Sequence, residues 1–268
     1  MKYLKQFLFA IILLSLLTGC SLSQNSDSDD TSEGFLISDL PLRHAAVNGA
    51  SIAYKELGIG EPLLLIAGIG ADMSMFNETF VRALANRYRV ILFDYRGLGA
   101  SNDPGPAFSM EMLTKDAADL LSALKISKAN IFGSSMGASI AQELALLYPE
   151  KVSRLVLSSP TYSITAPGAE ALNAMIHGIV NDLAVPITVR KQAEANLNWS
   201  GTYDRLKNIT NKTLLLAGTE DNLIPSAIAA DMQTKLINAQ LTVIDGAKHS
   251  GERYMPSEYA KIIMRFLS

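Results

Sequence analysis

Short, continuous apolar runs alternate along this chain with segments in which apolar residues recur every three or four positions. The runs predict buried strands, and the spaced pattern predicts helices that pack one face against those strands. Strands are expected at residues 62–68, 89–94, 129–133, 153–159, 212–218 and 239–245. Helices are expected at about 73–86, 112–125, 138–150, 226–236 and 256–267. Before them, an Asn48-Gly49 pair separates two short strand-like segments and predicts a β-hairpin.

Apolar strands that alternate with helices favour an α/β fold. We expect a mostly parallel sheet of about eight strands, with helices on both faces and right-handed crossovers. Ligands of such sheets bind beyond the carboxyl ends of the strands. The loops at that edge are therefore the places to look for functional residues.

The connection from Thr161 to Thr210 is longer than one crossover helix requires. Apolar residues in its first half follow a helical stripe, at Leu172, Met175, Ile176, Ile179 and Val180. Pro186 interrupts the pattern, and a second helical stretch is expected to run to about Trp199. Part of each stripe would pack on the core, but the extra length predicts a small helical lid, inserted at about 161–210, over one end of the sheet.

Ser135 lies at a predicted strand-to-helix joint, within Gly133-Ser134-Ser135-Met136-Gly137. A sharp turn at this joint would hold the serine backbone in a strained conformation with its hydroxyl exposed. Side chains at the two glycine positions would collide with neighbouring backbone. The G-x-S-x-G spacing alone is weak evidence for a nucleophile. Its strand–turn–helix context is what predicts a nucleophilic serine at position 135.

A serine hydroxyl needs a base to remove its proton, and the chain has three histidines. His44 lies in the predicted hairpin and His177 in the lid stripe, where structural or surface roles are expected. His249 follows the last predicted strand and precedes the last helix, at the same edge of the sheet as Ser135. His249 is therefore the predicted base.

The histidine in turn needs an acid that fixes its tautomer and stabilises its cation. Asp221 follows the predicted strand 212–218, and the side chain of its neighbour Glu220 is expected to point the other way. The preceding strand ends in Ser158-Ser159-Pro160, which offers no competing acid. Asp221 is the predicted acid, in the chain order serine, aspartate, histidine.

With these residues in place, residues 42–268 resemble the α/β-hydrolase fold superfamily, in its branch of small-lid esterases and haloperoxidase-like enzymes. Residues 94–101 are similar to that family's D-x-R-G-x-G-x-S stretch, and residues 218–225 are similar to its G-x-x-D-x-x-x-P stretch. The G-x-S-x-G turn and the histidine loop complete four motifs in the family's order. We interpret Asp94 and Arg96 as organisers of their loop rather than catalysts.

The chain departs from the family after the third predicted strand, where the usual His-Gly reads Ala67-Gly68. The resemblance implies that the backbone amides of Ile69 and Met136 form the oxyanion hole. Because amides carry this role, Ala67 need not abolish activity. It does remove a side chain that commonly braces the loop.

These residues favour a serine hydrolase, carboxylesterase-like, that cleaves a small carboxylic ester or lactone through an acyl-enzyme intermediate. A cofactor-free perhydrolase or a carbon–carbon bond hydrolase would use the same triad, so both stay open. Serine in place of an aspartate nucleophile argues against dehalogenase and epoxide hydrolase chemistry. The alternative from a different class is a non-catalytic, tethered binding protein.

The sequence contains no glycine-rich phosphate loop and no metal-binding cluster, so it predicts neither a cofactor nor a metal.

The N-terminus predicts export. Two lysines precede an apolar run at 7–17, which is short for a membrane-spanning helix and typical of a signal peptide. Leu17-Thr18-Gly19-Cys20 resembles a bacterial lipobox, which implies cleavage before Cys20, the chain's one cysteine, and acylation of its thiol and new amine. The predicted organisation is a signal peptide at 1–19, a lipidated cysteine and disordered tether at 20–34, and a hydrolase domain at 35–268. The expected location is a bacterial cell membrane or outer membrane, through this lipid anchor.

The charge of the predicted domain gives no sign of a nucleic-acid partner. The formal net charge of −3 becomes −5 without the two leader lysines, and setting aside the four acidic residues of the tether leaves −1 for residues 35–268. A near-neutral body without a basic cluster does not match the footprint of nucleic acid. A small, ester-like molecule is the expected partner, and the sequence leaves the oligomeric state open.

Overall fold

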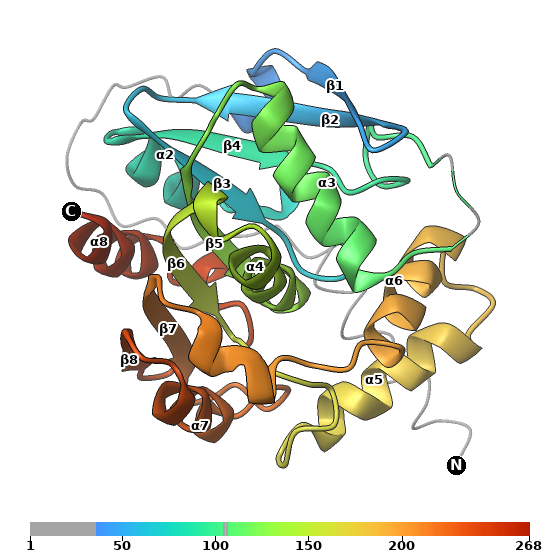
Figure 1. The fold of residues 1–268 in the computed structure, drawn as a ribbon, viewed down its shortest axis with the longest axis vertical. Coiled ribbons are helices and arrows are strands. Elements are labelled where there is room, and N and C mark those ends of the chain that lie inside the picture. The colour runs from blue at the N-terminus through green and yellow to red at the C-terminus, as the bar shows by residue number, and fades with distance from the viewer. Residues whose placement is uncertain (1–35, 104, 106) are drawn as a thin grey trace, which may run out of the picture. The chain divides into compact units, whose positions relative to one another are not determined.

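The computed structural model describes residues 36–103, 105 and 107–268, so the predicted leader, Cys20 and the tether lie outside the described residues. The described residues form one eight-stranded sheet in the order β1-β2-β4-β3-β5-β6-β7-β8 (Figure 1). Its strands are β1 (Arg43–Val47), β2 (Ala50–Leu57), β3 (Glu61–Ile66), β4 (Tyr88–Phe93), β5 (Ala129–Ser134), β6 (Val152–Ser158), β7 (Lys212–Gly218) and β8 (Ala239–Ile244).

Only the β1–β2 and β2–β4 pairs of this sheet are antiparallel, and the other five pairs are parallel. The hairpin turns at Asn48 and Gly49, which both have positive φ, as the Asn-Gly pair predicted. The predicted α/β class with a mostly parallel sheet is confirmed.

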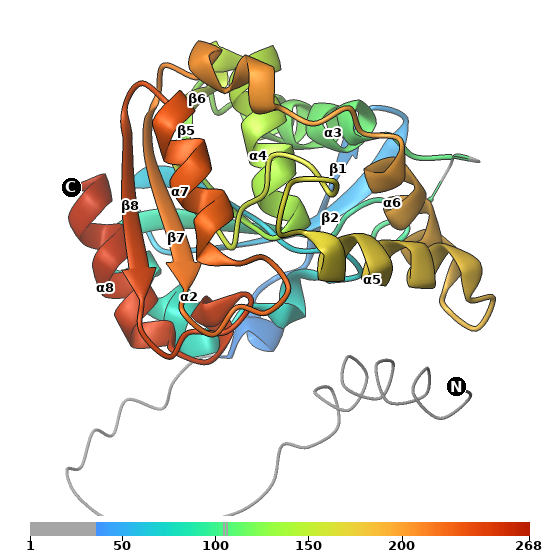
Figure 2. The same ribbon diagram turned by 90° about the horizontal axis from the view of Figure 1, so that it is seen from below.

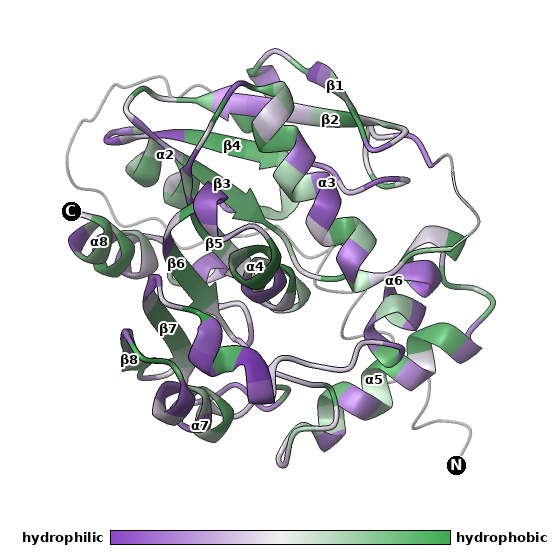
Figure 3. Cartoon of the chain, viewed as in Figure 1, coloured by the Kyte–Doolittle hydropathy of each residue, from purple (hydrophilic) through white to green (hydrophobic). Residues whose placement is uncertain are grey.

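Helices cover both faces of the sheet (Figures 1 and 2). Helix α2 (Glu78–Ala85) packs against α8 (Pro256–Leu267), and α3 (Met110–Ala123) packs against α4 (Met136–Leu147). Helix α7 (Ser226–Lys235) contacts β7 and β8. The central helix α4 buries residues all round and is among the most hydrophobic helices in Figure 3, because it lies between the sheet and other elements.

The predicted helix at 73–86 is wrong in its first half. Met73–Met75 form a short 3-10 turn, and α2 begins only at Glu78. The side chain of Asp72 accepts a hydrogen bond from the Ser74 amide at 2.8 Å, and Asn77 caps α2 by accepting from the Thr79 amide at 2.9 Å. Each of these side chains caps the start of its own turn, so the segment divides into two short helices, which apolar periodicity does not reveal.

The segment between β6 and β7 carries two lid helices, α5 (Glu170–Asn181) and α6 (Ile187–Leu197), which pack on each other (Figure 2). Within the predicted stripe, Leu172, Ile176 and Ile179 are buried and the other two positions are partly exposed. The predicted helical insertion is therefore present. No helix among the described residues has the length and apolar character needed to cross a bilayer.

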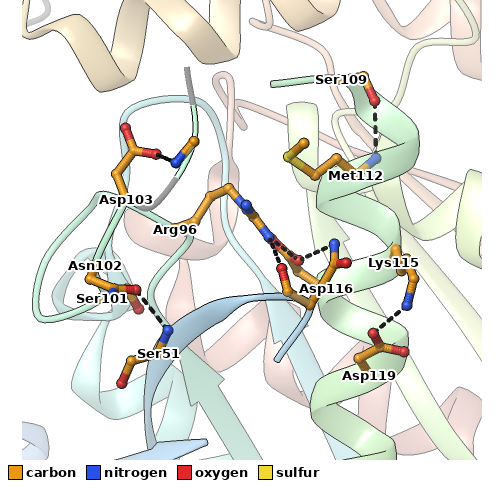
Figure 4. A network of polar contacts seen from close by, with 12 residues as sticks. Ser51, Arg96, Ser101, Asn102, Asp103, Ser109, Met112, Lys115, Asp116 and Asp119 are labelled. Atoms are coloured by element: carbon orange, nitrogen blue, oxygen red, sulfur yellow. Dashed lines mark hydrogen bonds and ion pairs between the residues drawn. The ribbon is translucent and has the colours of Figure 1, made fainter. Parts of the chain in front are cut away.

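A buried ion pair ties three separate segments together (Figure 4). Arg96, in the loop after β4, donates from Nε and Nη2 to the two carboxylate oxygens of Asp116 in α3, each at 2.6 Å. Asn48 of the hairpin turn donates to the same carboxylate at 3.1 Å. The Arg96 and Asp116 side chains are 3% and 1% exposed. Burial raises the pKa of Asp116, and the Arg96 guanidinium opposes that rise.

We predict that Arg96→Met lowers the free energy of unfolding by about 3–5 kcal/mol, because it leaves the Asp116 carboxylate buried without its counter-charge. Urea denaturation of the two proteins measures the loss. The double variant Arg96→Met/Asp116→Leu is the control and should recover much of it, since no buried charge remains. A single variant as stable as the wild type would contradict this account.

Candidate active site

The turn between β5 and α4 holds Ser135 in an unusual backbone conformation, with φ 55° and ψ −120°. Such a conformation is costly for a non-glycine residue and persists only where the surroundings impose it. A Cβ at Gly133 would overlap the Gly137 backbone, and a Cβ at Gly137 would overlap the carbonyl oxygens of Ile66 and Ala67. The expected reason for the two glycines is confirmed: both positions lie in backbone-to-backbone contacts that leave no room for a side chain.

The structure brings Ser135, His249 and Asp221 into one hydrogen-bonded row. His249 Nε2 lies 2.9 Å from Ser135 Oγ, and His249 Nδ1 lies 2.9 Å from Asp221 Oδ2. The three residues follow β5, β8 and β7 respectively, so the carboxyl edge of the parallel sheet collects them. With Nδ1–H donating to the carboxylate, Nε2 is free to accept the serine proton.

Asp221 is held in an ionised form suited to this contact. Its side chain is fully buried, and Oδ1 also accepts from the amides of Leu223 and Ile224 at 3.0 and 2.8 Å. Burial works to raise the pKa of Asp221, but the contacts with His249 and the amide bond from Ile224 outweigh it and lower the pKa. The carboxylate therefore carries its charge at neutral pH, directly behind the imidazole.

Ser135 opens into a small cavity of about 10 Å³, enough for about one water molecule. Ile69 and Met136, the residues whose amides were predicted to hold an oxyanion, line the same cavity. Met136 is the first residue of α4, so its amide has no acceptor within the helix. The remaining lining residues are Ser139, Thr161, Leu172, Ile176, Asn196 and Ile224.

The other candidate residues lie elsewhere. His44 Nε2 is 3.3 Å from the Ala100 carbonyl oxygen, and His177 Nδ1 is 3.0 Å from the Asn173 carbonyl oxygen on the surface of α5. Glu220 is exposed. Asp94 accepts from the amides of Met73 and Ala100, both at 2.8 Å, which supports its interpretation as a loop organiser. Cys20 lies outside the described residues.

Sequence reasoning missed Glu252, whose side chain is buried. Its carboxylate accepts hydrogen bonds from the hydroxyl groups of Ser134 and Ser158, at the ends of β5 and β6. The Ser158 carbonyl oxygen in turn accepts the Ser135 amide at 3.0 Å. Glu252 stands three residues after His249, so an acid inside the histidine loop was the available signal.

Sequence reasoning also missed Gln192 of α6, whose Oε1 accepts the Gly70 amide at 2.8 Å. Gly70 follows Ile69 directly, so a lid residue touches the loop that carries one predicted oxyanion donor. Gln192 stands between Lys191 and Ala193 in a largely polar helix, so no apolar periodicity marked it as buried. Within residues 36–103, 105 and 107–268, no group of His, Cys, Asp and Glu side chains could hold a metal ion.

Comparison with known proteins supports the same architecture. Residues 61–185 match the profile of the alpha/beta hydrolase fold family. The chain is 30% identical to the poly(3-hydroxyalkanoate) depolymerase of Ectopseudomonas oleovorans, over 77% of this chain and 84% of that one. It is 27% identical to the provisionally named carbamate hydrolase RutD of Azorhizobium caulinodans, over 85% of this chain and 98% of that one. A hydrolase from Pseudomonas aeruginosa superposes with a TM-score of 0.74 at 24% identity, over 85% and 98% of the two chains.

We predict that Gly137→Ala unfolds the protein or lowers its free energy of unfolding by more than about 4 kcal/mol, because the new methyl group overlaps two backbone carbonyl groups. The matched control is Gly178→Ala in α5, where no atom lies within 4 Å of the added Cβ. That control should be neutral or stabilising by about 1 kcal/mol. Urea denaturation compares the three proteins, and equal stability of both variants would refute the close approach at Gly137.

Proposed function

The chain belongs to the α/β-hydrolase fold family, and on that premise we propose that it is a serine hydrolase that cleaves a small carboxylic ester or lactone. The observation that carries this proposal is the row of hydrogen bonds from Ser135 through His249 to Asp221. The names of two relatives, a depolymerase and a carbamate hydrolase, also favour hydrolysis. A binding protein would have no need for a base aligned on a strained serine.

In the proposed acylation step, Ser135 Oγ attacks the carbonyl carbon of the ester while His249 Nε2 takes its proton. The carbonyl oxygen becomes an oxyanion that accepts hydrogen bonds from the amides of Ile69 and Met136. The tetrahedral intermediate then collapses: the bond to the alcohol oxygen breaks, and His249 returns the proton to that oxygen. Asp221 keeps the imidazole in the required tautomer and stabilises its cation.

Deacylation repeats the cycle with water as the nucleophile. His249 takes a proton from water, the resulting hydroxide attacks the acyl carbon, and the proton passes to Ser135 Oγ as the acid leaves. For a lactone, the alcohol stays attached to the acyl group, so hydrolysis gives a single hydroxy acid. A perhydrolase would use peroxide in the place of this water, so the two activities share the acyl-enzyme.

The cavity beside Ser135 favours a small acyl group. Its volume matches about one water molecule, and Leu172, Ile176 and Ile224 form apolar walls. An acyl chain of many carbons would have to displace the lid helix α5, which carries two of these walls. Esters of short acids are therefore the preferred substrate class, and p-nitrophenyl esters of increasing acyl length are the assay.

We further propose that the protein is exported and anchored to a bacterial membrane through lipidated Cys20. Support comes from the lipobox-like residues 17–20 and from the acidic, serine-rich segment that follows them. Several acyl chains, as in bacterial lipoproteins, give firm anchoring where one chain gives marginal binding. The catalytic domain would then work at a membrane surface on substrates that reach it from solution.

We predict that Ser135→Ala abolishes labelling by a fluorophosphonate probe and lowers esterase kcat by several orders of magnitude, because the nucleophile is lost. His249→Ala should cost a similar amount, and the two losses should not add because the residues act as a unit. Asp221→Asn should lower kcat by roughly 10⁴-fold, since the amide favours the wrong imidazole tautomer.

The controls are His44→Ala and His177→Ala, which should leave kcat within a few-fold of the wild type. If His177→Ala is inactive and His249→Ala is active, the base is His177 of the lid, and the assignment of His249 is wrong. A folded wild type that neither takes up the probe nor cleaves any ester would favour the binding-protein alternative.

We predict that the full chain expressed in bacteria partitions into the membrane fraction and that Cys20→Ser moves it to the soluble fraction. The reason is that the serine variant offers no thiol for acylation. Immunoblots of detergent-phase and aqueous-phase extracts measure the shift, with Ser135→Ala as the control that keeps the anchor. Equal partitioning of wild type and Cys20→Ser would exclude lipid anchoring at this residue.

A further inference from the structure

The loop of residues 68–70, which we call the oxyanion loop, has little stiffness of its own. Gly68 and Gly70 flank Ile69, and glycine places few restrictions on φ and ψ. Ala67 before it has only a methyl group, so it offers no polar side chain to brace the loop. One long turn bond, from the Ala71 amide to the Gly68 carbonyl oxygen at 3.4 Å, spans the loop. Further support for the Ile69 amide therefore has to come from outside the loop.

Two side chains from distant segments hold the ends of the oxyanion loop. Tyr95, which is buried, donates its hydroxyl to the Ala67 carbonyl oxygen at 2.7 Å. Gln192 of lid helix α6 accepts the Gly70 amide at 2.8 Å. The Gly70 amide belongs to the peptide group that follows Ile69, so this bond sets the orientation of Ile69 from its carboxyl side.

Helix α6 is seated firmly enough to act as a support. Val189, one turn before Gln192, lies 3.2 Å from the position that a Cβ of Gly70 would take, and Gly70 has a positive φ of 71°. Lys191 on the same helix forms an ion pair with Asp103 and donates to the Gly105 carbonyl oxygen at 2.7 Å. The helix is thus joined both to the oxyanion loop and to the loop after β4.

The hydrogen bonding of the Gln192 side chain indicates that its acceptor oxygen, Oε1, carries the residue's role. The residue is fully buried, and its Nε2 has no hydrogen-bond partner among the described residues. A buried donor without a partner is unfavourable, and an apolar side chain of the same size would avoid that cost. The bond from the Gly70 amide to Oε1 is the compensating contact.

We propose that Gln192 is a positioning residue for the oxyanion hole, so that the lid supplies the brace that Ala67 lacks. This inference rests on the proposed function, because it assigns a role within the same site. Through Gly70, the glutamine holds the Ile69 amide where the oxyanion of the acylation and deacylation steps develops. The lid is then part of the catalytic apparatus as well as a wall of the cavity.

The test is Gln192→Met, which keeps the length of the side chain and removes the acceptor. We expect kcat for a short-chain p-nitrophenyl ester to fall by about 10- to 100-fold, less than the loss of a whole oxyanion donor, with KM within about threefold. The second-order rate constant for fluorophosphonate labelling and the affinity for phenylboronic acid should fall in parallel, since both adducts place an oxygen in the oxyanion hole. A merely structural role would change the unfolding midpoint and leave these three readouts unmoved.

The matched control is Gln233→Met, the same substitution at an exposed position of α7, which should leave all readouts unchanged. If Gln192→Met does not fold, Gln192→Ala replaces it. The smaller side chain leaves room for a water molecule that satisfies the Gly70 amide, so the variant can fold without a side chain that fixes the loop. A folded Gln192 variant with wild-type kcat and wild-type labelling rate overturns the proposal. Failure of the proposed function is distinguishable, because then the wild type itself would show neither ester cleavage nor labelling.

Discussion

The close approach of helix α4 to the end of β3 determines the geometry of the whole site. Gly137 meets the carbonyl oxygens of Ile66 and Ala67 without room for a methyl group, and Gly133 meets the backbone of Gly137 in the same way. The contact forces the turn that strains Ser135. It also holds the last residues of β3, from which the oxyanion loop departs. Nucleophile and oxyanion loop are therefore positioned by one backbone contact, and a change there would move both.

Buried carboxylates near the carboxyl edge of the sheet have different roles because their partners differ. Asp221 faces an imidazole and two amides, Asp94 faces two amides, Asp116 faces a guanidinium, and Glu252 faces two serine hydroxyl groups. Only Asp221 contacts a group that can exchange a proton with the proposed nucleophile. The other three stabilise loops at the carboxyl edge of the sheet, where the backbone leaves regular structure and its polar groups need partners.

In the proposed enzyme, the lid both limits the size of the acyl group and supports the oxyanion loop. Helix α5 supplies apolar walls beside Ser135, while α6 supplies the acceptor that holds the oxyanion loop. Because both helices pack on each other, a substrate that displaced α5 would also disturb the support of the Ile69 amide. Such coupling favours acyl groups that fit beside Ser135 without displacing α5.

The sequence by itself determined the order of strands and helices, the Asn-Gly hairpin, the helical insertion and the positions of Ser135, Asp221 and His249 at strand ends. These features follow from local periodicity and from glycine stereochemistry, and parallel strands bring their carboxyl ends to one edge whatever lies between them. Only the tertiary structure decided which side chains brace the site. Gln192 and Gly70 are separated by 122 residues, and Ser134 and Glu252 by 118. Contacts at such separations depend on how α6 and the histidine loop dock, which no local pattern encodes.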